Sequence, residues 1–221
     1  MHRFVLASLV LLAGCSVPER HEDWPSGVAA VRHEAAQARK PCVVFYAPTN
    51  VYDHTLGPWQ EAFLESPETD WLQSDAELVA TREWSECEAL AAEFPFLSNQ
   101  LGPIVLVLDA EGELLTGFSA YSGCVRRGCG RPTPDEFVAV LASRIRRELK
   151  RGISVPELTR RTLQAPDEPV FHELAVRLED CGDYGTLKTV CERMLEEQEL
   201  RQEFADVVQA KLHMANAMLR L

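Results

Sequence analysis

Residues Lys40–Trp59 read KPCVVFYAPTNVYDHTLGPW, and the predicted elements of the chain are arranged around this stretch. It begins with a short apolar run, Cys42–Tyr46, which is rich in β-branched and aromatic residues and is bounded by Pro41 and Pro48. Such a run is typical of a strand that is buried on both faces. A helical pattern of apolar residues follows from about Trp59. Because α/β folds place ligands where a buried strand ends in a loop before a helix, this loop is the first candidate for a functional site.

The three residues Tyr46–Pro48 (Tyr-Ala-Pro) resemble the Trp-Ala-Pro that precedes the Cys-x-x-Cys motif of the thioredoxin superfamily. In that register the two cysteine positions fall on Asn50 and Asp53, and the buried aspartate of many thioredoxins falls on Val44. Attack on a disulfide needs a thiolate, which neither asparagine nor aspartate supplies. The resemblance therefore implies a thioredoxin-like α/β fold whose redox centre is missing.

The elements predicted around this strand follow the order of a thioredoxin domain, αβαβαββα, over residues 24–151. Helices and strands are expected at about residues 24–40, 42–46, 59–72, 76–81, 85–94, 104–108, 113–118 and 133–151. Ser85 with Glu88, and Thr133 with Glu136, each have the spacing of a helix capping box. The apolar stripe expected on the last helix consists of Phe137, Val140, Leu141 and Ile145. We expect these elements to form a central mixed sheet flanked by helices.

Pro103 completes the candidate ligand loop. In the thioredoxin fold a cis-proline opens a strand beside the active loop, and Pro103 occupies that place directly before the apolar run Ile104–Leu108. Only about 5–6% of X-Pro bonds in folded proteins are cis, so this expectation comes from the resemblance alone. Asn50, Asp53 and His54 are the other members of the loop. Asp53 and His54 have side chains that bind metals or transfer protons, although an Asp/His-rich surface loop is the simpler interpretation.

The residues that follow, 152–221, are predicted to form an all-helical extension. Ser154 and Glu157 have capping-box spacing, and helices are expected at about residues 170–181, 187–198 and 199–219. Residues 174–195 resemble one helical hairpin of a tetratricopeptide repeat. Because one such unit cannot bury its own apolar face, we expect it either to pack on the α/β domain or to offer a groove to a partner.

The N-terminus has the features of a bacterial lipoprotein signal. A short basic start precedes an apolar run, Phe4–Ala13, which is too short to be a permanent membrane-spanning helix. The run ends in Leu12–Cys15 (Leu-Ala-Gly-Cys), which resembles a lipobox. The resemblance implies a signal peptide over residues 1–14, a Cys15 that carries acyl chains such as palmitate, and a tether over 15–23. An ordinary secretory signal with an incidental Cys15 is the alternative. Ser16 favours an outer membrane, facing the periplasm, in a source with two membranes.

Export to an oxidising compartment permits disulfides among the six other cysteines. They are Cys42, Cys87, Cys124, Cys129, Cys181 and Cys191. Cys124 and Cys129 flank two arginines, which favour a reactive thiolate, although a small structural disulfide is the simpler interpretation. Cys42 and Cys87 either pair or are buried, and Cys181 and Cys191 are expected to be two core thiols. No second cysteine pair has zinc-site spacing, so no metal or cofactor is predicted.

The net charge of −12 argues against a nucleic-acid partner, because phosphate binding needs a basic surface. The sequence therefore predicts a membrane-anchored, redox-inactive thioredoxin-like protein of the cell envelope that binds a protein or peptide partner. A thiol–disulfide oxidoreductase that uses Cys124 and Cys129 is the alternative. A third interpretation makes the helical extension the working part and the preceding domain a spacer.

Overall fold

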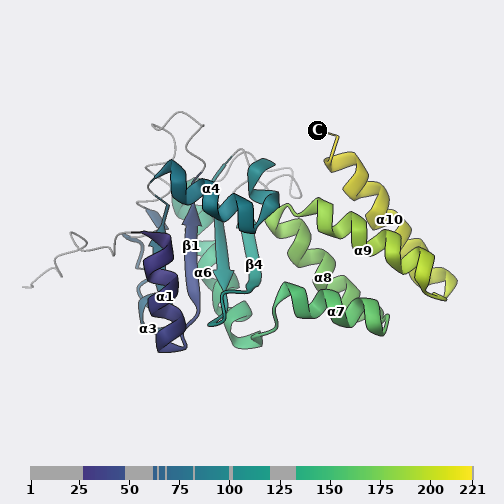
Figure 1. Cartoon of the computed structure of the whole chain (residues 1–221), viewed down its shortest axis with the longest axis horizontal. Helices are drawn as coiled ribbons and strands as arrows, with labels where there is room; N and C mark the ends of the chain where they lie inside the picture. The colour runs from purple at the N-terminus through teal and green to yellow at the C-terminus, as the bar shows by residue number, and fades with distance from the viewer. Residues whose placement is uncertain are drawn as a thin grey trace, which may run out of the picture.

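The computed structural model describes residues 27–47, 62–63, 65–67, 69–81, 83–99, 102–119 and 133–220. These residues form one mixed sheet with helices on both faces, followed by a helical extension (Figure 1). In the part of the chain that the structure describes, no helix has the length and apolar character needed to cross a membrane.

The sheet contains β1 (Cys42–Tyr46), β2 (Glu77–Ala80), β3 (Ile104–Leu108) and β4 (Leu114–Ser119), in the order β2-β1-β3-β4. β1 runs parallel to β2, and β3 runs antiparallel to both β1 and β4. Every residue of β1 and β3 is buried, as their continuous apolar sequence predicts. The expectation of a central mixed sheet flanked by helices is confirmed.

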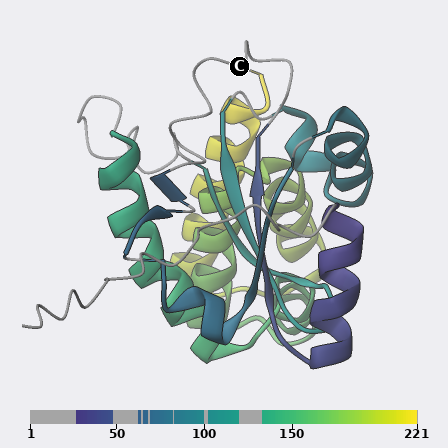
Figure 2. The same cartoon turned by 90° about the vertical axis from the view of Figure 1, so that its left-hand side faces the viewer.

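The helices of the first half cover the two faces of the sheet. They are α1 (Val28–Ala38), α3 (Leu72–Asp75), α4 (Trp84–Glu93) and α6 (Pro134–Arg151), with the 3₁₀ helix η2 (Pro95–Asn99) after α4. Alternate strand residues point to opposite faces. Thus Val44 packs in one hydrophobic cluster with α1 and α4, whereas Phe45 packs in a second cluster with α3 and α6. Figure 2 shows α6 on one side of the sheet, with α1 and α4 on the other.

Helix capping agrees with the sequence at α6 and differs at α4. Thr133 Oγ1 accepts a hydrogen bond from Glu136 N, and Glu136 Oε2 accepts one from Thr133 N, so the predicted capping box is confirmed. In α4 the capping box joins Glu83 and Glu86. The predicted Ser85–Glu88 cap is therefore wrong, because the helix begins earlier in the sequence. Glu86 also accepts a hydrogen bond from Val28 N at 2.9 Å, which ties α4 to the start of α1.

The apolar stripe predicted on α6 is wrong at Val140, and the side chain of Phe137 lies outside those that the structure describes. Val140 is 50% exposed, whereas Leu141 and Ile145 are buried as expected. Val138 and Ala142 complete the buried side of the helix. Their spacing of three and four residues places them in one line with Leu141 and Ile145, which leaves Val140 on the outer side.

The helical extension contains α7 (Val155–Gln164), α8 (Glu168–Cys181), α9 (Tyr184–Glu197) and α10 (Gln202–Met218). Its helices share one hydrophobic cluster with the sheet face that α1 and α4 cover. α8 lies against β4, where a Cβ added to Gly117 would lie only 2.7 Å from the Cβ of Cys181. The extension therefore packs directly on the α/β part, which was the first of the two arrangements expected from sequence.

A buried arginine fastens α8 to the rest of the molecule. Arg177 is 3% exposed, and its Nη1 donates to the carbonyl oxygens of Leu115 at 2.8 Å and Ile153 at 2.5 Å. Its Nη2 lies 3.0 Å from Glu148 Oε2 and 2.7 Å from Glu173 Oε1. One side chain thus joins β4, the segment between α6 and α7, α6 itself and α8.

Candidate functional site

Most of the residues singled out from sequence lie outside the described part of the chain. These are Cys15, Asn50, Asp53, His54, Cys124 and Cys129. Pro103 is described, and it is buried with a trans peptide bond, since the described residues contain no cis bond. The cis bond that the resemblance favoured is therefore not found at Pro103.

The described residues do show where the predicted loop leaves the sheet. Tyr46 pairs with Ile104, so the end of β1 and Pro103 lie at the same end of the sheet. Ala47 follows β1 and is held from two sides. Its N–H donates to Thr81 Oγ1 at 3.0 Å, and its carbonyl oxygen accepts from the thiol of Cys87 at 3.4 Å.

The cysteines within the described residues are all buried and form no disulfide there. Burial raises the pKa of Cys42 to about 12 and that of Cys191 to about 12, and it also raises the pKa of Cys181. At neutral pH these thiols stay protonated, whereas attack on a disulfide needs the thiolate. Cys42 and Cys87 are thus buried rather than paired with each other, and the expectation of two core thiols at Cys181 and Cys191 is confirmed.

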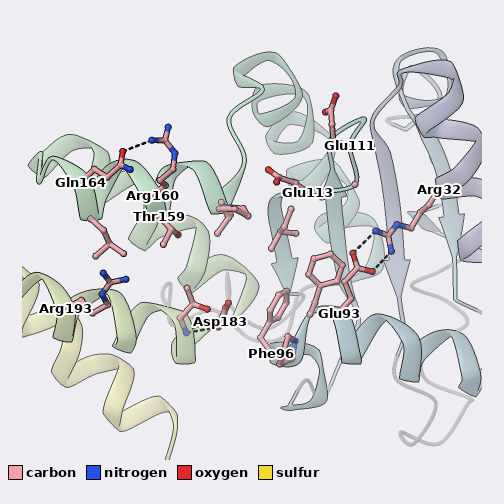
Figure 3. A pocket seen from close by; sticks show the side chains of 18 residues that line it. Arg32, Glu93, Phe96, Glu111, Glu113, Thr159, Arg160, Gln164, Asp183 and Arg193 are labelled. Carbon is pink, nitrogen blue, oxygen red and sulfur yellow. Dashed lines mark hydrogen bonds and ion pairs between the residues drawn. The ribbon is translucent and has the colours of Figure 1, made fainter.

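A groove of about 910 Å³ lies between the α/β part and the helical extension (Figure 3). Charged side chains of α1, α4 and the β3–β4 turn lie along one wall, and polar side chains of α7 and α9 lie along the other. Its apolar lining consists of Phe94, Pro95, Phe96, Leu114, Val155, Pro156 and Leu163. A second cavity of about 450 Å³ shares Phe96, Leu163 and Arg193 with the groove and extends to Leu219. Because they share lining residues, the two cavities lie next to each other, and both halves of the molecule line each of them.

Local sequence positions the wall on the α/β side. In the β3–β4 turn, Asp109 Oδ1 accepts hydrogen bonds from the backbone N–H of Glu111 at 3.0 Å and of Glu113 at 2.8 Å. Gly112 has φ 86°, a conformation that glycine adopts without steric cost. Burial raises the pKa of Asp109 above its ordinary value. Ser154, the N-cap of α7, donates to Glu113 Oε2 at 2.6 Å, so the turn is also joined to the extension.

The two walls differ in charge. On the α/β wall, Arg32 and Glu93 form a bidentate ion pair at 2.5 and 2.7 Å. Within the described residues no cation pairs with Glu111 or Glu113, so this wall carries excess negative charge. On α7, Arg160 and Arg161 share the carboxylate of Glu157, at 2.7 and 2.6 Å. Hydrogen bonds from both arginines lower the pKa of Glu157. The helix carries one excess positive charge, although only Arg160 of the two arginines lines the groove.

No sequence motif located this groove or identified the residues that line it. Its lining comes from seven elements or turns, which belong to four separate regions of the chain: residue 32, residues 93–96, residues 111–114 and the helical extension. The only signal was the expectation that an unpaired helical hairpin would pack on the α/β part or offer a groove, and the structure contains both features.

The lining of the groove combines apolar side chains with charged and polar ones. Neither cysteine nor histidine occurs among the lining residues that the structure describes. Over the same described ranges, no group of three acidic, histidine or cysteine side chains is arranged to hold a metal ion. No protein-family model matches the chain, and no curated protein or solved structure was found to be similar to it.

Proposed function

We propose that this protein is a membrane-anchored, thioredoxin-like binding module of the cell envelope that does not exchange disulfides. The strand order β2-β1-β3-β4, with β3 antiparallel to its neighbours, is compatible with a thioredoxin-like fold. Asn50 and Asp53 stand in the sequence where that family has its two cysteines. The Leu12–Cys15 motif supports lipid attachment at Cys15.

One observation carries the binding part of this proposal: the groove between the α/β part and the extension. It has the volume of a ligand site, an apolar lining and charged walls, and its lining contains no thiol or imidazole among the described residues. The described thiols, in contrast, are buried in the core. Surface recognition is therefore the function that this geometry supports best.

Photo-crosslinking in the intact cell tests the proposal. We would place benzoyl-phenylalanine at Thr159 or Gln164, which line the groove, and at Ser143, which is exposed on α6 away from it. The groove positions are expected to give a defined crosslinked protein that the Ser143 control does not give. The crosslinked protein is then identified by mass spectrometry and titrated against the purified chain.

Two results would overturn the proposed function. The first is crosslinking that is absent from the groove positions or equal at Ser143. The second is reduction of insulin at thioredoxin-like rates, lost in Cys124→Ser, which would favour the alternative oxidoreductase. The anchor is tested separately, because Cys15→Ala is expected to release the chain from the membrane fraction and to abolish its acylation.

A further inference from the structure

We infer that the groove takes an amphipathic helical segment of a partner protein, with lysine or arginine along one flank of that helix. This inference rests on the proposed binding function and specifies the chemistry of the partner. It follows from three features of the groove: the elements that line it, the charge of its two walls, and the contacts that fix its width.

The lining favours a helix over an added strand. α7, α9 and η2 supply most of the groove, and Leu114 at the start of β4 is its single residue from a strand within the described chain. Addition of a strand requires an open row of backbone groups along a sheet edge, whereas only the first residue of the edge strand β4 borders the groove. An amphipathic helix needs instead an apolar strip with room for side chains spaced three or four residues apart. Phe94, Phe96, Val155 and Leu163 provide such a strip.

The charge of the α/β wall determines which residues are favoured on the flank of the bound helix that faces it. Glu111 and Glu113 leave the α/β wall negative, and Figure 3 places both across the groove from Arg160. A bound helix therefore meets negative charge on one flank, where lysine or arginine is favoured. On the opposite wall Arg160 and Arg193 are already paired with Glu157 and Glu197, so the charges there are balanced. The net charge of −12 on the whole chain also attracts a cationic segment over longer distances.

The groove is held at a fixed width before any partner binds. The Ser154–Glu113 hydrogen bond at 2.6 Å joins the two walls at one end. The buried Arg177 joins Leu115 O of β4 to Ile153 O, which lies just before α7. Because these contacts exist in the unbound chain, little ordering is needed on binding, and a short segment can bind with useful affinity.

The test uses a display library of amphipathic helical peptides with fixed apolar positions and randomised flanks, sorted on the full-length chain. The peptides selected are expected to be enriched in lysine and arginine on one flank. Their affinity is expected to fall by about tenfold or more, equivalent to ~1.4 kcal/mol, for Glu111→Lys/Glu113→Lys relative to Ser154→Ala, which removes the Ser154–Glu113 hydrogen bond but keeps both negative charges. The matched variant Glu34→Lys/Glu88→Lys makes the same change in net charge on exposed surface outside the groove and is expected to bind within about twofold of wild type. Sorting on Glu111→Lys/Glu113→Lys is expected to select acidic residues on that flank instead.

Four results would overturn the inference. They are the absence of any enriched peptide, enrichment without basic residues, an equal loss of affinity in the control variant, and a dimer in sedimentation experiments that dissociates with Glu111→Lys/Glu113→Lys. The last result would make a second copy of this chain the occupant. If crosslinking from Thr159 persists while the peptide result fails, the proposed function stands and only this inference is wrong. If both fail, the groove is not a binding site.

Discussion

At the scale of single residues, the contact between Gly117 and Cys181 sets how closely β4 and α8 approach. A Cβ at Gly117 would lie 2.7 Å from the Cβ of Cys181 and 3.5 Å from its Cα. Neither atom belongs to a flexible side-chain end, so the helix or strand must shift to make room. Glycine is required here for close packing of the backbone.

We therefore expect Gly117→Ala to lower the free energy of unfolding by about 1–3 kcal/mol, as overpacking of a core does. Urea unfolding followed by circular dichroism measures this change. Gly185→Ala is the control, because its Cβ would meet only Asp183 Oδ1 at 3.7 Å and alanine favours a helix. Equal stabilities for Gly117→Ala and wild type would contradict the contact.

The buried thiol of Cys42 predicts a dependence of stability on pH. Burial raises its pKa from 9.0 to about 12. The unfolded chain therefore loses this proton near pH 9, while the folded protein holds it until about pH 12. The stabilising effect is complete below pH 9 and is lost as the pH rises from 9 towards 12, by about 1.4 kcal/mol per pH unit.

Cys42→Ala is expected to weaken this fall in stability, as measured by urea unfolding at intervals between about pH 8 and 10.5. The exposed variant Ser143→Ala should follow the wild-type curve. If Cys42→Ala and wild type lose stability in parallel over this range, the thiol is not the titrating group.

At the scale of elements, the ion pairs around Arg177 determine how the extension is held. Glu148 is 3% exposed and lies 3.0 Å from Arg177 Nη2, with Arg147 Nε at 2.9 Å on its other oxygen. Arg144 of α6 also pairs with Asp180 of α8. α6 and α8 are thus joined by ion pairs, while their buried apolar side chains belong to different hydrophobic clusters.

Arg177→Met is expected to cost about 3–5 kcal/mol, because it leaves Glu148 buried with one fewer partner and removes two hydrogen bonds to carbonyl oxygens. The double variant Arg177→Met/Glu148→Leu is expected to recover part of this loss, since no buried carboxylate then lacks its partner. A double-mutant cycle by urea unfolding measures the coupling. Strictly additive losses would show that the two side chains do not interact energetically.

The sequence predicted correctly those elements whose boundaries depend on residues that are close together in the chain. The continuous apolar runs Cys42–Tyr46 and Ile104–Leu108 gave both central strands with their correct ends. Thr133 and Glu136 located the start of α6, because a capping box needs only residues within one turn. Ser85 and Glu88 have the same spacing, yet α4 is capped two residues earlier, where Glu86 also binds the start of α1. A contact between distant segments decided between the two caps, and a local pattern does not contain that contact.

At the scale of the whole molecule, the α/β part and the extension share one hydrophobic cluster. The groove could not be predicted from local sequence patterns, because Phe96, Glu113 and Arg160 line one groove only when the extension packs on the α/β part. The residues of either half, taken alone, do not indicate the groove. The shared cluster also implies that the two halves unfold together.

Cooperative unfolding can be tested with two probes of one chain. All four tryptophans precede residue 85, so their fluorescence reports on the α/β half, whereas far-ultraviolet circular dichroism is sensitive to the helices of the extension. We expect the same urea midpoint from both probes.

We also expect a chain that ends at residue 151 to aggregate, because Leu106 and Leu114 would lose part of the apolar surface that covers them. Two separate midpoints, or a soluble and folded truncated chain, would contradict the shared core.

The docking of α8 on β4 has a consequence for synthesis of the chain. Arg177 and the carbonyl of Leu115 that it binds are 62 positions apart, so the sheet stays open along that face until most of the polypeptide has left the ribosome. Contacts over such separations form slowly, since a long loop must close before they contribute. The nascent protein should therefore remain incompletely folded, and a good client for chaperones, until its final third has emerged.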